Sequence, residues 1–339
     1  MTRPLQFAAL GIDHRHIFGM SGNMQNSGAE FVSWWTEGAP DTQESFEKRF
    51  PDIPKAEELS DILENSDIDL VLIANIPSKR AELAIAAMEA GKDVMVDKPG
   101  CTTLEQLNAI KDCVARTGRI WSVNFSERFE VASVTRAAEL VHYGAIGKVV
   151  QTLGMGPHRL NEPTRPDWFF KRECYGGILT DIGSHQIDQF LYFTGSTDAD
   201  ISLSSVANYA NPRHPGLQDF GEVALRNENG HAYIRVDWYT PDALPNWGDG
   251  RLTILGTEGY IELRKYVDVA GAPGIDHLFL VNGDRCEKID CSDAGLPYFE
   301  RLTNDIRNRT ETAMTQAHAF KVMELAIKAQ TMAEAGAKS

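Results

Sequence analysis

The sequence predicts an α/β protein with two domains: a doubly wound parallel sheet, then an α/β domain with a large, mostly antiparallel open sheet. The chain has 339 residues, which exceeds the length at which a single core keeps growing. Up to residue 124, short apolar runs alternate with helical stretches, as in βαβ units. After residue 129, longer segments alternate apolar and polar residues with period two, as a half-buried antiparallel sheet does. We therefore place the domains at residues 1–124 and 125–339.

Short apolar runs are the strand candidates of the first domain. They occupy residues 7–10, 30–35, 69–74, 93–96 and 120–123. Helical periodicity fills residues 56–64, 79–90 and 103–116. Gly91 and Gly118 stand where glycine commonly ends a helix.

The second domain begins with a helix at 134–143, a turn at 144–147 and a strand at 148–153. A helix around Asp181 follows an aromatic run. Period-two alternation then predicts strands at 201–209, 219–226, 232–239, 251–255 and 260–263. A final helix is expected at 315–333.

Composition favours a cytoplasmic protein that binds small molecules. No apolar stretch approaches the roughly 20 residues that span a bilayer, and the first apolar run suits a strand better than a signal peptide. The five cysteines are scattered without CxxC pairs, as reduced thiols are. A net charge of -15 argues against nucleic-acid or membrane partners. Small molecules and further copies of the chain remain as expected partners.

Lys98, Asp181 and His185 are the candidate catalytic residues. Lys98 follows the strand candidate 93–96, and open α/β sheets bind ligands at the carboxyl ends of their strands. A helix places Asp181 and His185 one turn apart on one face. A carboxylate can orient an imidazole, and histidine accepts a proton near neutral pH. These residues predict a site that removes a proton from a substrate.

The helix that carries Asp181 has a second interpretation. Its polar positions form one stripe, made of Asp181, Ser184, His185, Asp188 and Tyr192. An N-capped amphipathic helix with a solvated face would show the same pattern. The position of Lys98 at the carboxyl end of a strand candidate favours the catalytic interpretation.

The first two strand candidates predict a dinucleotide site. The first ends at Gly11 and the second ends near Glu37, and an acidic residue about 20 to 26 residues on accepts hydrogen bonds from the adenosine ribose. Glu37 suits NAD better than NADP, since a carboxylate repels a 2'-phosphate and no Arg or Lys lies between Glu37 and Lys48. Glu37 could instead begin a solvated loop.

The loop after the first strand departs from the glycine-rich fingerprint. Asp13 and His16 stand where small residues allow the backbone to approach a pyrophosphate. Asp13 could turn away to cap the following helix, while Arg15 or His16 faces the phosphates.

The histidines of this loop also allow a metal interpretation. His14 and His16, with Asp13, could be ligands, but no second cluster supplies further ones, so no metal is expected. Elsewhere, His158 could reach a substrate hydroxyl or simply lie in a loop. Trp168, with Phe169 and Phe170, could form an apolar wall against a sugar ring, although an aromatic run more often belongs to the core.

Three motifs occur in a consistent order. They are residues 84–99, which end in Asp97-Lys98-Pro99, residues 124–129 with 144–149, and Gly176-Gly177 through Asp181, His185 and Asp188. Together they resemble the Gfo/Idh/MocA oxidoreductases, the group that contains glucose-fructose oxidoreductase and inositol dehydrogenase. The first resembles the family's Glu-Lys-Pro motif, with Asp97 in place of Glu. The resemblance implies a Rossmann domain followed by an α/β domain whose open sheet forms homodimers or homotetramers.

The resemblance also implies roles for residues. Lys98 would position the substrate hydroxyl, His185 would remove its proton, and Asp181 would orient both. The residues expected to hold NAD are Gly11, Ile12, Asp13, His14, His16, Glu37, Ala74, Asn75, Pro77, Asp97, Lys98 and Asn124. The residues expected to contact substrate are Lys98, Arg128, His158, Trp168, Asp181 and His185. Arg80 departs from the family, because many members have His there, and Pro77 is shifted by one position.

The leading hypothesis is an NAD-dependent dehydrogenase that oxidises a secondary hydroxyl of a sugar, cyclitol or related polyol. Two alternatives stay open. One is a lyase or glycosidase that retains NAD and oxidises its substrate transiently, using the same residues. The other is a non-catalytic sensor, against which the joint presence of Lys98, Asp181 and His185 counts.

Overall fold

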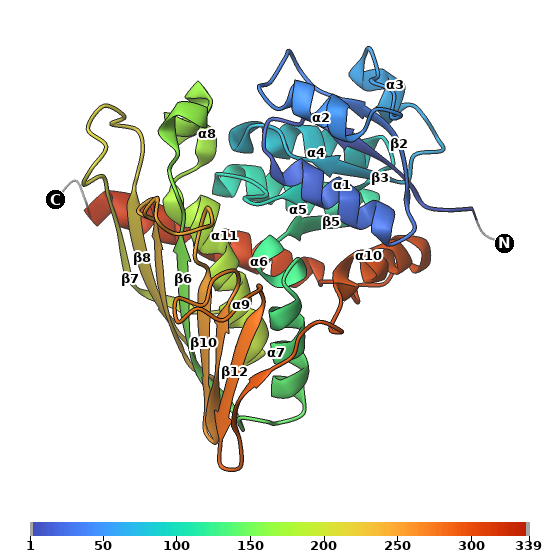
Figure 1. The fold of residues 1–339 in the computed structure, drawn as a ribbon. Helices are drawn as coiled ribbons and strands as arrows, with labels where there is room; N and C mark the ends of the chain where they lie inside the picture. Colours follow the sequence, from blue (N-terminus) through green and yellow to red (C-terminus); the bar gives the residue numbers. More distant parts are fainter. Residues whose placement is uncertain (1–2, 337–339) are drawn as a thin grey trace. The chain divides into compact units, whose positions relative to one another are not determined.

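The computed structural model describes residues 3–336, which fall into two compact units. The N-terminal unit takes in the chain up to Asn124, then Glu173–Gly176 and Pro297–Phe320. The C-terminal unit holds Phe125–Arg172, Gly177–Leu296 and the chain from Lys321. Each unit is therefore built from segments that are distant in the sequence (Figure 1).

The sheet of the N-terminal unit is parallel throughout, as predicted. Its order is β2-β1-β3-β4-β5. The strands are β1 (Gln6–Leu10), β2 (Glu30–Trp35), β3 (Leu70–Ile73), β4 (Asp93–Asp97) and β5 (Trp121–Asn124). β3, β4 and β5 are buried at every position, as strands covered by helices on both faces are. The sequence therefore predicted the doubly wound sheet correctly.

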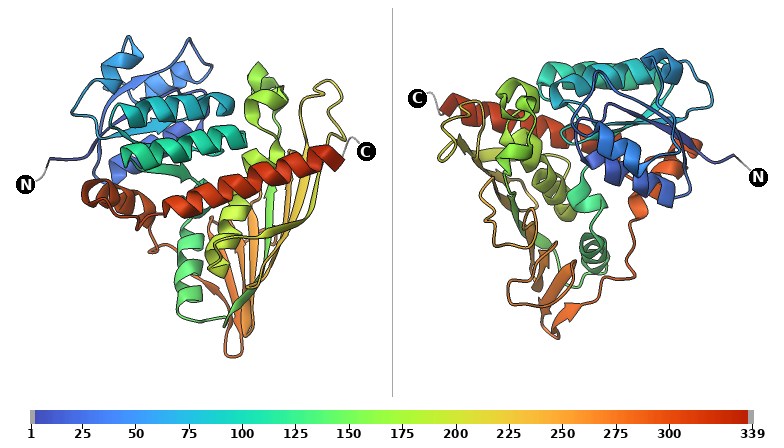
Figure 2. Two further views of the ribbon diagram at one scale, coloured as in Figure 1. Left: turned by 180° about the vertical axis from the view of Figure 1, so that it is seen from behind. Right: turned by 45° about the horizontal axis from the view of Figure 1, so that its top comes forward.

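Helices cover both faces of this sheet. They are α1 (His16–Asn26), α2 (Gln43–Arg49), α3 (Leu59–Leu63), α4 (Arg80–Glu89), α5 (Leu104–Thr117) and α10 (Pro297–Asn308), with a short 3-10 helix η1 (Pro77–Lys79) before α4. α4 and α5 lie side by side on one face (Figure 2). α5 begins at Thr103, whose side chain accepts a hydrogen bond from the Gln106 N–H, and ends at Gly118 with φ +65°. α1 is the helix expected after the first loop, whereas α2 and α10 were not predicted.

The C-terminal unit contains a large, mostly antiparallel sheet, also as predicted. Its order is β13-β12-β11-β10-β6-β9-β8-β7, and only β6 and β9 pair in parallel. The strands are β6 (Val149–Pro157), β7 (Asp200–Ala207), β8 (Phe220–Arg226), β9 (His231–Asp237), β10 (Arg251–Gly256), β11 (Gly259–Arg264), β12 (His277–Asn282) and β13 (Cys286–Ile289). The sequence did not reveal β12 and β13, so the sheet is wider than expected.

Helices pack on one face of this sheet. They are α6 (Ser126–Phe129), α7 (Ala132–His142), α9 (Ser184–Thr194) and α11 (Gln316–Gly336), and α8 (Arg172–Tyr175) is a short turn. α9 lies directly over β6, where Gly154 and Gly156 leave room for it. A Cβ on Gly154 would stand 2.6 Å from Gln186 Cγ, so a larger residue would push α9 off the sheet. This close approach fixes the helix that carries His185.

The opposite face of the large sheet exposes apolar side chains. Leu153 and Tyr233 face each other across β6 and β9, and Leu203, Leu255 and Tyr260 are exposed on neighbouring strands. Among the described residues, no helix has the length and hydropathy needed to cross a bilayer.

We predict that Gly11→Ala destabilises the protein more than Gly28→Ala. Both glycines have positive φ, +70° and +85°, which costs alanine about 1–2 kcal/mol. A Cβ on Gly11 would also lie 2.4 Å from Asn75 Cβ, whereas one on Gly28 meets nothing within 4 Å. The steric overlap should add about 1–3 kcal/mol. Urea denaturation of both variants measures this, and equal losses of unfolding free energy would contradict the close approach.

Candidate active site

The predicted cofactor residues of the N-terminal unit gather at one edge of its sheet. Gly11 follows β1, Glu37 follows β2, and Ala74 follows β3. Asp97 ends β4, and Asn124 ends β5. Because the strands are parallel, their carboxyl ends meet at the edge where open α/β sheets bind ligands. Main-chain hydrogen bonds hold this edge together: the Gly11 N–H donates to Trp35 O at 2.8 Å, and the Ala74 N–H to Gly11 O at 3.2 Å.

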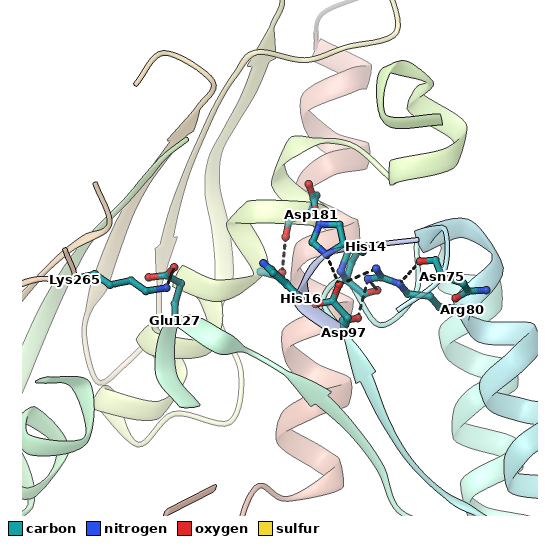
Figure 3. Close-up of polar contacts among 10 residues, drawn as sticks. His14, His16, Asn75, Arg80, Asp97, Glu127, Asp181 and Lys265 are labelled. Carbon is teal, nitrogen blue, oxygen red and sulfur yellow. Dashed lines mark hydrogen bonds and ion pairs between the residues drawn. The ribbon is translucent and has the colours of Figure 1, made fainter. Parts of the chain in front are cut away.

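Asp97 is the centre of a polar cluster at this edge (Figure 3). Its carboxylate is fully buried, and each oxygen meets an imidazole: Oδ2 lies 2.8 Å from His14 Nδ1, and Oδ1 lies 2.8 Å from His16 Nδ1. Arg80 NH2 donates to Oδ2 at 2.9 Å. The histidines of the unusual loop are therefore tied to β4. Asp97, which we expected to contact cofactor, has both oxygens engaged by side chains of its own unit.

Arg80 connects the loops that follow β3 and β4. Its guanidinium is completely buried. Besides Asp97 Oδ2, it donates to Asn75 O at 2.9 Å, Asp97 O at 2.9 Å and Pro99 O at 3.0 Å. The sequence identified Arg80 only as a departure from the family pattern. A lone arginine at the start of a helix gives no sign that four acceptors converge on it.

Burial and neighbouring charges shift the pKa values of His14 and Asp97. Burial lowers the pKa of His14 to about 4, against the opposing attraction of Asp97, so His14 is neutral at pH 7. Burial alone would raise the pKa of Asp97. The electrostatic effects of His16 and Arg80 outweigh burial and hold the pKa of Asp97 well below its ordinary value.

The cluster also bears on the metal interpretation of the histidines. Among the described residues, ligand-type atoms of His14, His16 and Asp97 lie within 4.8 Å of one another. The carboxylate beside the histidines is thus Asp97, not Asp13 as the sequence suggested. Arg80 already donates to this carboxylate, and Lys98 adds positive potential at His14. The guanidinium thus already supplies a positive charge to the carboxylate that a metal ion would need as a ligand.

Asp13 does not cap α1. The residue before α1 is Arg15, and no side chain makes a cap hydrogen bond there. The loop is instead anchored by its main chain: the His14 N–H donates to Ala74 O at 2.8 Å, and the Thr42 hydroxyl donates to Ile12 O. Burial raises the pKa of Asp13, with Arg80 and Lys79 opposing it. The proposed compensation for Asp13 by capping was therefore wrong.

Glu37 is paired with a lysine that the sequence did not connect to it. Lys79 Nζ, in η1, lies 2.7 Å from Glu37 Oε2. Both side chains are largely exposed, Lys79 at 53% and Glu37 at 74%. The hydrogen bond to Glu37 raises the pKa of Lys79. No cation was expected near Glu37, because Lys79 is remote in the sequence and reaches it from the end of β3.

Asp181 and His185 are brought together in the C-terminal unit, one turn apart and buried at 8% and 2% exposure. Asp181 lies in a π-helical turn, Leu179–Gly183, that runs directly into α9. Ser184 and Asp188 of the same stripe are fully buried. The alternative of a solvated polar face was therefore wrong for these residues, although Tyr192 is exposed as it predicted. Buried polar groups on a π-bulge are typical of functional sites.

Arg128 and Asp188 form a buried ion pair beside α9. Arg128 Nε and NH2 donate to the two carboxylate oxygens, both at 2.7 Å. The guanidinium also stacks against Phe129 and Tyr192, at 4.3 and 4.5 Å from the ring centroids. Arg128, which we expected to contact substrate, thus links α6 to α9 through these two hydrogen bonds.

The remaining predicted substrate residues belong to an aromatic region of the C-terminal unit. His158 Nδ1 is 2.9 Å from Gly156 O, and its ring packs on Trp238 and Trp247. Trp168 packs edge-on against Phe169, which in turn contacts Trp238. His158 and Trp168 therefore border one connected group of rings. No local sequence pattern indicates that Trp247 belongs to this group.

Lys265 and Glu127 form a further buried pair that the sequence did not reveal (Figure 3). Lys265 Nζ lies 2.8 Å from Glu127 Oε1. Burial would lower the pKa of Lys265, but the charge of Glu127 outweighs it and raises that pKa. The pair joins α6 to the end of β11.

These features define a class: a dinucleotide-binding α/β unit joined to a unit with an open sheet and a buried Asp-His pair. Comparison with known families agrees. Residues 15–125 match the model "Oxidoreductase family, NAD-binding Rossmann fold", and residues 134–262 match the "GFO/IDH/MocA C-terminal domain". The chain belongs to the Gfo/Idh/MocA oxidoreductase family, as its motifs suggested. The N-terminal match begins at Arg15 and so leaves out Gly11 to His14.

Two curated relatives match this chain over part of their length. The chain is 28% identical over 226 residues to scyllo-inositol 2-dehydrogenase (NAD(+)) of Bacillus subtilis (strain 168), covering 65% of this chain and 63% of the relative. It is 31% identical over 197 residues to levoglucosan dehydrogenase of Pseudarthrobacter phenanthrenivorans, covering 57% of this chain and 49% of the relative. The matches thus span less than two thirds of these relatives.

Solved structures match over nearly the whole chain. A presumed oxidoreductase from Erwinia carotovora atroseptica SCRI1043 is 47% identical, with a TM-score of 0.93 over 96% of this chain and 98% of its own. Levoglucosan dehydrogenase in complex with NADH and levoglucosan has a TM-score of 0.78 over 98% of both chains, at 19% identity. The second likeness is evidence of the shared fold alone.

We predict that His14 makes the protein less stable in mild acid. Its folded pKa of about 4 lies below the ordinary 6.5, so the unfolded chain binds more protons between these values and stability falls as pH falls. The loss should reach about 3 kcal/mol by pH 4. His14→Gln should remove this part of the pH dependence in urea denaturation between pH 7 and 4.5, whereas His231→Gln, at an exposed site, should not. Parallel curves for wild type and His14→Gln would contradict the prediction.

Proposed function

We propose that the protein is an NAD-dependent dehydrogenase that oxidises a secondary hydroxyl of a sugar, cyclitol or related polyol. The observation that carries the proposal is the buried pair Asp181 and His185, held one turn apart where α9 rests on β6. A buried imidazole beside a carboxylate suits proton removal from a neutral hydroxyl. Family membership supports oxidoreductase chemistry, and two curated relatives are named as dehydrogenases of scyllo-inositol and levoglucosan.

The donor groups of the N-terminal unit fit a dinucleotide. Gly11 has φ +70° and lies so close to Asn75 that a Cβ would stand 2.4 Å from Asn75 Cβ, so only glycine allows the tight turn at the end of β1. α1 begins at His16, just after this loop, and the positive end of a helix dipole attracts phosphate. Glu37 is exposed at the end of β2 and can accept ribose hydroxyls. Gly11, Ile12, Asn75, Pro77 and Glu37 would hold the cofactor.

His14 and His16 would line this cofactor site as side chains fixed by Asp97. Their Nδ1 atoms face the carboxylate, so the opposite ring edges are the ones left to meet a ligand. In this proposal Asp97 acts by orienting the imidazoles. Ala74 and Asn124 contribute through the strand ends at which they lie.

The roles in the reaction follow from the chemistry of each group. Bound NAD would accept a hydride from the substrate carbon. Lys98 would hold the hydroxyl by donating a hydrogen bond, His185 would take its proton, and Asp181 would orient the hydroxyl and the imidazole. His158 and Trp168 would border the substrate, with the aromatic group against an apolar sugar face.

We also propose that the protein works as a homodimer or homotetramer in the cytoplasm. The exposed apolar side chains of the large sheet, such as Leu153 and Tyr233, form a face that a second copy could cover. Across residues 3–336, no disulfide links any of the five cysteines, which suits a reducing compartment.

We expect His185→Ala to abolish turnover while NADH affinity stays within about twofold, since the imidazole acts on the substrate proton. Protein cleared of nucleotide would first be titrated with NADH, and NADH production would then be followed with scyllo-inositol and levoglucosan. His231→Ala, at an exposed position of β9, is the matched control and should retain full activity.

Each result of that experiment has a defined meaning. A large loss of NADH affinity in His185→Ala would show that the residue serves the cofactor. Failure of the wild type to bind any dinucleotide would overturn the proposed function. Binding without net NADH production from any polyol would favour transient oxidation, in which the hydride returns to the substrate in each turnover.

A further inference from the structure

The ion pair between Lys79 and Glu37 lies at the part of the sheet edge where cofactor choice is made. Glu37 follows β2, and Lys79 lies in the segment that follows β3. These strands flank β1 on its two sides, so the pair bridges the end of β1. Its 2.7 Å contact joins Lys79 Nζ to Glu37 Oε2, the side chain expected to discriminate NAD from NADP.

A second carboxylate, that of Asp13, interacts electrostatically with both Lys79 and Glu37. Asp13 follows β1, and its pKa is affected by Lys79, which lowers it, and by Glu37, which raises it. Asp13 in turn raises the pKa of Lys79. Asp13, Glu37 and Lys79 thus form one electrostatic group, with Arg80 facing Asp13 from the start of α4. In this group Lys79 is the cation with an exposed head.

The ion pair between Lys79 and Glu37 is weak enough for a ligand to replace Glu37 as the partner of Lys79. An exposed ion pair typically changes the equilibrium constant for unfolding by no more than about fivefold. A phosphate dianion attracts an ammonium group more strongly than a carboxylate does, because it carries more charge and three acceptor oxygens. Moving Lys79 from Glu37 to a phosphate would therefore cost little.

We propose that Lys79 is a second determinant of cofactor choice and receives the 2'-phosphate of NADP when that cofactor binds. This rests on the proposed function, since it requires the adenosine end of a dinucleotide at Glu37. With NAD, Glu37 accepts the ribose hydroxyls and keeps Lys79 as its partner. With NADP, Glu37 repels the phosphate while Lys79 attracts it, so the two effects partly cancel.

The consequence is a modest preference for NAD and real binding of NADP. A carboxylate alone would exclude the 2'-phosphate, whereas a carboxylate with an adjacent lysine leaves a preference of about tenfold. Curated relatives at similar identity include a scyllo-inositol 2-dehydrogenase named for NAD(+) and another named for NADP(+). Choice of cofactor is therefore not a property of the fold and must depend on local residues such as these.

A double-mutant cycle tests the proposal by fluorescence titration with NADH and NADPH. Lys79→Met should weaken NADPH binding about tenfold and change NADH binding less than about threefold. Glu37→Gln should strengthen NADPH binding about tenfold, because the repulsion ends and Lys79 is released. The double variant should lose most of that gain. Lys288→Met, an equal charge change at an exposed position of β13, should alter neither affinity.

The outcomes separate this proposal from the proposed function. NADH binding with the predicted shifts in NADPH affinity supports it, as does a steeper salt dependence for NADPH in the wild type than in Lys79→Met. NADH binding with an unchanged NADPH to NADH ratio in Lys79→Met would overturn the role of Lys79 and leave the dehydrogenase intact. Failure of the wild type to bind either dinucleotide would overturn both.

Discussion

The N-terminal unit depends on one buried carboxylate. Asp97 carries a charge with no exposure to solvent, and such a charge persists only when its oxygens are fully paired. Arg80, His14 and His16 supply those partners from the segments that follow β3 and β1. The pairing therefore ties three strand ends together at the edge where a ligand binds. It also explains how the loop tolerates histidines in place of small residues: their rings are directed at β4.

A comparable constraint positions His185 in the C-terminal unit. Gly154 and Gly156 allow α9 to approach β6 until side chains of Gln186 and Ile182 would touch a Cβ. The π-helical turn Leu179–Gly183 contains Asp181, and all of its residues are buried. Helix and strand are thus locked without bulky residues between them, which leaves Asp181 and His185 on a rigid support, as a catalytic pair requires.

The sequence was sufficient for elements that local periodicity defines. β1 to β5 and the sheet from β6 to β11 follow from apolar runs and period-two alternation, and Asp181 and His185 from helical spacing. The sequence was insufficient where a side chain is held by a partner that is distant along the chain. α2 is short and is held by Phe46 packing on Trp34 and Phe31, which no local pattern reveals. The links from Arg80 and His16 to Asp97, and from Lys79 to Glu37, likewise exist only once the strands are ordered side by side.

The balance of charge at the strand ends suggests how this site would attract a dinucleotide. Asp13, Glu37 and Asp97 are offset by Lys79, Arg80 and Lys98, and His14 adds no charge near pH 7. A balanced set provides little net attraction for a pyrophosphate. The attraction must come from the main chain at the start of α1, where the positive end of the helix dipole lies at this edge. The side chains then serve to hold that main chain in place, and their charges act chiefly in selecting between dinucleotides.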